Sequence, residues 1–154
     1  MGKRPGVRRR GRGGMQFRAA ATQKLKPAKY PSFSLDEERK GEIIDLVHES
    51  GRDVPLSKVR FEDGAISFIP APLGTKVGQR ISFGLNSEII DGNVISIQNI
   101  PDGTIVCNVE KQFGDGGSFI KTAGADATVF SHADDGVILK LASGKFKKLN
   151  PKNR

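Results

Sequence analysis

The chain has 154 residues, of which 36% are hydrophobic, 19 are glycine and none is tryptophan, as is typical of small, turn-rich β modules with little aromatic packing. A single cysteine, Cys107, excludes an internal disulfide framework and a cysteine-based zinc site. The net charge of +8 is concentrated at the two ends, because all 17 acidic residues lie in residues 31–144 beside only ten basic ones.

The first thirty residues form a basic arm with ten Lys and Arg and no acid. Its segment 3–14 lacks apolar periodicity and is predicted to be disordered when free. An acid-free arm cannot neutralise itself, so we expect a polyanionic partner, namely RNA. Phe17 and Tyr30 either stack on bases or anchor the arm on the body. The predicted RNA contacts of the arm are Lys3, Arg4, Arg8, Arg9, Arg10, Arg12, Phe17, Arg18, Lys24, Lys26 and Lys29.

Targeting and membrane segments are not expected. No apolar stretch is long enough to cross a bilayer, and the N-terminus lacks the apolar core of a secretory signal. Pro5 and five glycines interrupt the amphipathic helix that a transit peptide needs, and no serine precedes Ser32. We therefore expect an intracellular protein without a membrane partner.

The body is predicted to be a series of short strands. Ser34 and Glu37 resemble a helix capping box, but Gly41 and the β-branched residues that follow favour a strand over 42–48. Asp63-Gly64 predicts a hairpin through a type I′ turn. The remaining strands are expected at 56–62, 65–70, 79–85, 94–100, 104–110, 118–123, 127–131, 137–141 and 145–149.

Strands at this spacing predict an all-β fold of small barrels. Since about nine strands exceed one five-stranded barrel, we expect the body to divide near residue 92.

Catalytic chemistry is not expected. His48 and His132 fall in separate modules without a second histidine or cysteine nearby, so we predict no catalytic residue, no metal and no cofactor. The glycine-rich segments 11–14 and 114–117 lack the Lys-Ser/Thr ending of a nucleotide-binding loop.

Two further sets of residues are predicted to contact RNA. Glycines at 114, 116 and 117 leave backbone amides open to a sugar-phosphate strand, although a plain hairpin tip is the alternative. The acid-free C-terminal end either binds phosphates or forms a solvated hairpin face. The predicted contacts are Lys111, Gly114, Gly116, Gly117, Lys121, Lys145, Lys147, Lys148, Lys152 and Arg154.

Four motifs occur in a characteristic order. They are Arg10-Gly11-Arg12-Gly13 followed by Phe17-Arg18-Ala19, Val59-x-Phe61-Glu62-Asp63-Gly64, Val106-Cys107-Asn108-Val109-Glu110 followed by Gly114-Asp115-Gly116-Gly117, and Lys140-Leu141-x-Ser143-Gly144-x-x-Lys147-x-Leu149. In this order they resemble the archaeal and eukaryotic branch of the L-two family of large-subunit ribosomal proteins.

That resemblance implies an N-terminal extension over residues 1–33, an OB-like barrel over 34–92 and an SH3-like barrel over 93–154. It implies a structural protein of the cytoplasmic ribosome that binds large-subunit rRNA near the peptidyl-transferase region, beside neighbouring ribosomal proteins and without a small-molecule substrate. Family members continue past the position of Arg154 into a basic extension, so we expect a truncated member.

Two other functions are considered. An RNA-processing or RNA-modifying enzyme with a basic targeting arm needs a catalytic constellation, for which Glu110 and Asp115 are the nearest acidic pair. A protein–protein adaptor would use the acidic body.

Overall fold

The computed structural model describes residues 2, 5, 7, 14–17, 24–31, 38–84, 87–133 and 135–154. The predictions for the disordered segment 3–14 and for the capping box at Ser34 and Glu37 fall largely or wholly outside these residues. So do the predicted contacts Lys3, Arg4, Arg8, Arg9, Arg10, Arg12 and Arg18. Within the described part, no helix has the length and apolar character needed to span a bilayer.

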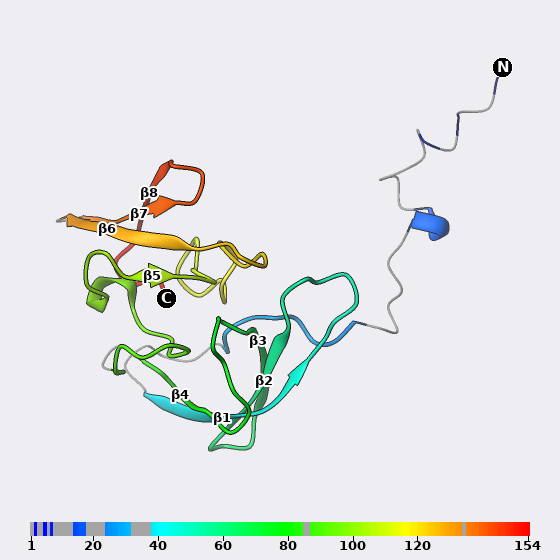
Figure 1. Cartoon of the computed structure of the whole chain (residues 1–154), viewed down its shortest axis with the longest axis horizontal. Coiled ribbons are helices and arrows are strands. Elements are labelled where there is room, and N and C mark those ends of the chain that lie inside the picture. Colours follow the sequence, from blue (N-terminus) through cyan, green and yellow to red (C-terminus); the bar gives the residue numbers. More distant parts are fainter. Residues whose placement is uncertain are drawn as a thin grey trace.

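The described strands form two four-stranded antiparallel sheets (Figure 1). The first has the order β3-β2-β1-β4 and consists of β1 (Arg39–Val47), β2 (Leu56–Phe61), β3 (Ile66–Pro70) and β4 (Arg80–Phe83). The second has the order β5-β6-β7-β8 and consists of β5 (Ile105–Val106), β6 (Ala127–Ala133), β7 (Gly136–Leu141) and β8 (Phe146–Leu149). The prediction of an all-β fold is therefore confirmed. The strand expected over 42–48 overlaps β1, which begins three residues earlier and ends at Val47. The division into two barrels near residue 92 stays a prediction.

The predicted hairpin at Asp63-Gly64 joins β2 to β3. The N–H of Gly64 donates to the Phe61 carbonyl at 2.9 Å, and the Asp63 carboxylate accepts the N–H of Ala65 at 2.9 Å. Only Gly64 has a positive φ, of 80°. A type I′ turn needs positive φ at both central residues, so the predicted turn type is wrong although the hairpin is present.

The first sheet packs its inner face around Phe83, which has no exposed surface. The Phe83 ring lies 6.4 Å from the Tyr30 ring and 5.1 Å from the Phe61 ring, between centroids, in tilted and edge-to-face geometries. Such pairs contribute about 0.5–1.5 kcal/mol beyond area burial. The core of this sheet consists of Tyr30, Ile43, Val59, Phe61, Ile69, Ile81, Phe83 and Val94.

The second sheet has its own core of smaller aliphatic residues. It consists of Ile97, Val109, Ala127, Val129, Val137, Leu139 and Leu149. In β7 the residues of this core alternate with outward-facing ones, as expected for a sheet with one buried face. The absence of aromatic rings from this core agrees with the composition.

Two predicted strands are absent. In 94–100, Val94 makes only an isolated bridge to Phe83, and Ile97–Asn99 is a short 3-10 helix. The reason is that the C-terminal segment takes the hydrogen bonds of this stretch, since the N–H of Ile97 donates to the Asn153 carbonyl at 2.8 Å. In 118–123, only Phe119 forms a bridge, and Ile120 has a φ of 56°, which is incompatible with a regular strand.

Truncation of the central aromatic side chain tests the packing of the first sheet. We expect Phe83→Ala to lower the free energy of unfolding by about 3–5 kcal/mol, because it removes a buried ring and leaves a cavity. The matched control is Leu73→Ala, since Leu73 is 98% exposed and its truncation should change stability by about 0.5 kcal/mol or less. Urea unfolding followed by circular dichroism measures both. Equal effects of the two variants would contradict this assignment of the core.

Candidate RNA-binding surface

The segment 24–31, at the end of the basic arm, contacts both halves of the body. Ala28 forms a parallel bridge with Phe68 of β3. Further along, the N–H of Tyr30 donates to the Gly116 carbonyl at 2.8 Å, and the Tyr30 hydroxyl donates to the Asn108 carbonyl at 2.7 Å. The segment therefore lies on the first sheet and reaches the loops of the second (Figure 1).

Tyr30 anchors the arm. It is 8% exposed and belongs to the core of the first sheet, so of the two roles considered for it, anchoring is the one that the structure supports. Burial is the main cause that raises the pKa of Tyr30 far above its ordinary value. Phe17, by contrast, is 39% exposed, and its stacking on RNA stays a prediction.

Glu49 holds the start of the segment. Its carboxylate accepts the N–H of Leu25 at 3.0 Å and the Nε–H of Arg52 at 2.5 Å. The hydrogen bond from Arg52 is the largest of the effects that lower the pKa of Glu49, and it acts together with the charge of Arg52 and the Leu25 N–H against burial, which would raise that pKa. Lys24 and Lys26 remain exposed on either side of Leu25.

A buried carboxylate organises the opposite end of the surface. Glu110 has no exposed surface, and its Oε1 accepts the N–H of Gly116 at 3.1 Å and the Nη2–H of Arg154 at 2.7 Å. Its Oε2 accepts the Nε–H and the backbone N–H of Arg154 at 3.2 and 3.0 Å. The guanidinium carbon of Arg154 also lies 5.7 Å from the centre of the Tyr30 ring. A bidentate pair of this kind fixes the C-terminal segment against the loop 111–118 and the N-terminal segment.

A second carboxylate shapes the loop 111–118 from within. Asp115 accepts the backbone N–H groups of Lys111 at 3.1 Å and Gly117 at 3.0 Å, and it also accepts the Ser118 hydroxyl. Burial would raise the pKa of Asp115, but the hydrogen bonds from the Ser118 hydroxyl and from backbone N–H groups outweigh it and hold that pKa below its ordinary value. The loop is thus held in one turn conformation by its own acidic residue.

The glycines of this loop do not all face solvent. Gly116 and Gly117 are buried, and their N–H groups donate to Glu110 and Asp115. A Cβ at Gly116 would lie 2.9 Å from the Cβ of Lys29, and one at Gly117 would lie 2.6 Å from Asn108. The space left by their missing side chains is therefore filled by the protein. Gly114 is exposed, with open space around it.

Two lysines converge on the glycine pair. The Lys29 side chain lies against Gly116, and the Nζ of Lys121 donates to the Gly117 carbonyl at 3.3 Å. Among the described residues, neither has a carboxylate within ion-pair distance. Lys111 is exposed at the start of the same loop. We call Lys29, Lys111, Lys121 and the loop 111–118 the lysine–glycine surface.

The predicted C-terminal contacts have different environments. Lys145, Lys147 and Lys152 are exposed, and Lys148 is exposed but forms an ion pair with Asp135. Arg154 is 7% exposed and bound to Glu110. Direct contact of these residues with RNA stays a prediction, and the structure gives Arg154 a positioning role.

The sequence did not indicate the role of Glu110. It is separated from Arg154 by 44 residues, so a scan for local acid–base pairs cannot find the ion pair. Nor did the sequence indicate the role of Asn153. Its buried amide donates to the Glu110 carbonyl at 3.0 Å. The only local signal is that Glu110 directly follows the apolar core residue Val109.

Breaking the buried ion pair tests its role. We expect Glu110→Gln to lower the free energy of unfolding by about 3–5 kcal/mol, because it leaves the Arg154 cation buried without a counter-charge. The double variant Glu110→Gln/Arg154→Met should recover part of this loss. Asp63→Asn is the control, since its exposed ion pair with Arg39 contributes about 1 kcal/mol or less. Strictly additive effects in the double variant, measured by urea unfolding, would contradict this role.

The pKa of Glu49 predicts an acid-sensitive attachment of the segment 24–31. A pKa lowered on folding stabilises the folded state above the unfolded value of 4.5, and this stability is lost as the pH falls through the lower folded value. We expect wild type to be more stable than Glu49→Gln near pH 6, with the difference shrinking as the pH falls to about 3. Urea midpoints across this range measure the difference. A difference independent of pH would refute the prediction.

Comparison with known proteins finds similarity along the whole chain. Residues 90–154 match the family model described as Ribosomal Proteins L2, C-terminal domain. Over all of its 154 residues, the chain is 70% identical to the large ribosomal subunit protein uL2 of Cenarchaeum symbiosum, of which it covers 63%. The protein of the same name from Nitrosopumilus maritimus is 69% identical, and that from Sulfolobus acidocaldarius is 41% identical, each matched over the whole chain and 64% of its own length.

The chain thus spans about 63% of the length of the curated relatives that it matches. The matches extend along the entire chain. The chain belongs to the uL2 family of large ribosomal subunit proteins.

Proposed function

We propose that the chain is a structural component of the large ribosomal subunit that binds and stabilises large-subunit rRNA through the lysine–glycine surface. Its relatives are named as large ribosomal subunit proteins, which supports this partner and a place among neighbouring ribosomal proteins. The position near the peptidyl-transferase region that the family implies stays a prediction.

The observation that carries the proposal is the convergence of Lys29 and Lys121 on one glycine pair. Their ammonium groups come from segments far apart in the sequence and lack a carboxylate partner among the described residues. Lysine side chains on one surface without a carboxylate partner favour an anion beside them, and the phosphates of an RNA backbone supply it.

The rigidity of the surface supports recognition by shape. Glu110 and Asp115 fix the loop 111–118 through backbone N–H groups, so little conformational entropy is lost there when RNA binds. Folded RNA is recognised largely through its backbone and its shape, which a preformed loop between cations suits. The basic arm and the C-terminal lysines add phosphate contacts in this proposal.

The enzyme alternative is less well supported. The Glu110 carboxylate is buried and receives four hydrogen bonds, and the Asp115 carboxylate is occupied by its own loop. The nearest acidic pair in the sequence is therefore committed to structure, and membership of the uL2 family implies a structural role.

Neutralising the two converging lysines tests the proposal. We expect Lys29→Gln/Lys121→Gln to flatten the slope of log K against log salt for large-subunit rRNA by about 0.7–0.9 for each phosphate that these lysines neutralise in the wild type. The stability of the variant should stay close to wild type, since neither lysine has an ion-pair partner among the described residues. Filter binding across a salt series with transcribed rRNA gives the slope.

The matched control is Lys76→Gln, an exposed lysine in the loop between β3 and β4, which should leave the slope unchanged. A slope that falls equally for the control and the double variant would mean that only the overall charge matters. An unaltered slope in the double variant would exclude the lysine–glycine surface as a phosphate contact.

A further inference from the structure

The outer face of the second sheet carries an exposed aromatic pair. Phe130 and Phe146 are 54% and 56% exposed, and their rings pack edge to face with centroids 4.9 Å apart. Neither belongs to the core beneath the sheet. Single exposed apolar residues are ordinary on protein surfaces, whereas a paired aromatic cluster marks a contact site more often.

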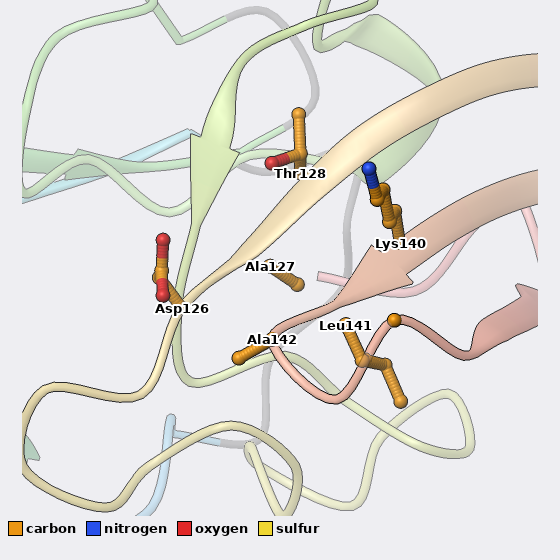
Figure 2. Close-up of a pocket in the computed structure, with 7 residues that line it drawn as sticks. Asp126, Ala127, Thr128, Lys140, Leu141 and Ala142 are labelled. Carbon is orange, nitrogen blue, oxygen red and sulfur yellow. The ribbon is translucent and has the colours of Figure 1, made fainter.

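Strand register places this pair on one face with a lysine. Phe146 lies opposite Lys140, and Lys140 lies opposite Thr128, so the three share the outer face. Figure 2 shows Thr128 and Lys140 pointing to the same side of their neighbouring strands, while Leu141 points to the other. Because cross-strand neighbours face the same way, Lys140 lies beside the Phe146 ring.

The second ring lies at a β-bulge of β6. The register between β6 and β7 shifts between Val129, which is buried opposite Leu139, and Ser131, which lies opposite Ile138. Phe130 is the extra residue. Burial along β6 alternates up to this residue, with Ala127 and Val129 buried, so Phe130 faces outward with Thr128 and its ring meets that of Phe146 two strands away.

The charge around the pair is positive. The segment 137–149, which forms most of β7, the turn and β8, contains four lysines and no acid, and neither β5 nor β6 contains an acid. By register Lys140 and Lys148 share the outer face, whereas Lys147 lies opposite the core residue Leu139. The nearby carboxylates lie at the margins. Asp135 is paired with Lys148, and Asp126 lines a recess of about 230 Å³ at one end of the face, beside Thr128 and Lys140 (Figure 2).

We infer that Phe130 and Phe146 form a stacking platform for unpaired RNA bases, with Lys140 and Lys145 of the adjoining turn contacting the neighbouring phosphates. Single-stranded nucleic acid combines flat apolar bases with a polyanionic backbone, and aromatic side chains interleaved with cations match both. An apolar protein partner would use the rings but would leave the lysines without counter-charge. This inference rests on the proposed function, because it names a second RNA contact on the same chain.

A tryptophan reporter tests the platform directly, since the chain contains no tryptophan. In Phe146→Trp the indole keeps a stacking surface at an exposed position, so the fold and the affinity should be retained. The probe is an adenine-rich single-stranded RNA of about twelve nucleotides, within the usual site sizes for such surfaces. We expect saturable quenching of the tryptophan fluorescence. The matched control is Leu73→Trp, at a 98% exposed position next to the first sheet, which should not be quenched.

Removal of both rings provides the second measurement. Phe130→Ala/Phe146→Ala should weaken binding of the same RNA by about 5- to 100-fold for each base that stacks, and the salt slope should stay as in wild type, because stacking releases no counterions. Circular dichroism reports whether this variant folds. If it does not, the fluorescence of Phe146→Trp decides alone.

The outcomes separate the two proposals. An unquenched Phe146→Trp, or full affinity in the double alanine variant, overturns the platform while binding to large-subunit rRNA by wild type remains intact. A response of Phe146→Trp to ribosomal proteins but not to RNA would assign the face to a protein and also overturns it. Failure of wild type to bind large-subunit rRNA would refute the proposed function itself.

Discussion

The lysine–glycine surface depends on one buried carboxylate, that of Glu110. Glu110 receives donors from the loop 111–118 and from Arg154, and Arg154 in turn lies over the ring of Tyr30. Burying a charge is costly unless its hydrogen-bonding capacity is filled, and the four donors on Glu110 fill it. Three segments distant in sequence are thereby held together, namely the N-terminal segment that carries Lys29, the loop 111–118 and the C-terminal end. The buried ion pair between Glu110 and Arg154 thus positions the backbone of the exposed lysine–glycine surface.

The strands that could be predicted are those whose signals, a turn dipeptide and an alternating pattern, lie within the strands or directly beside them in the sequence. Asp63-Gly64 and the alternation on its two sides indicate β2 and β3, and the same holds for β7 and β8 around Ser143-Gly144. Residues 94–100 have equal β propensity, yet their hydrogen bonds go to the C-terminal segment more than fifty residues away. Propensity cannot foresee such competition, because it depends on a partner that only the folded chain provides.

The candidate site shows the same limit. The RNA contacts predicted for Lys29 and Lys111 stay predictions, and both side chains are exposed. Charge runs gave Arg154 the same role, although it is buried against an acid 44 residues away. The outward position of Phe130 follows the alternation of β6, but its packing against Phe146 depends on the pairing of three strands, which is not local information.

Lysine footprinting tests the central claim most directly. Acetylation of the chain with and without bound large-subunit rRNA, quantified by mass spectrometry, reports which ammonium groups the RNA covers. The account predicts strong protection of Lys29 and Lys121 together, at RNA concentrations that leave Lys76 fully reactive, because Lys76 lies in the loop between β3 and β4, outside the lysine–glycine surface. Protection of Lys76 equal to that of Lys29 and Lys121, or no protection of the pair, would contradict it.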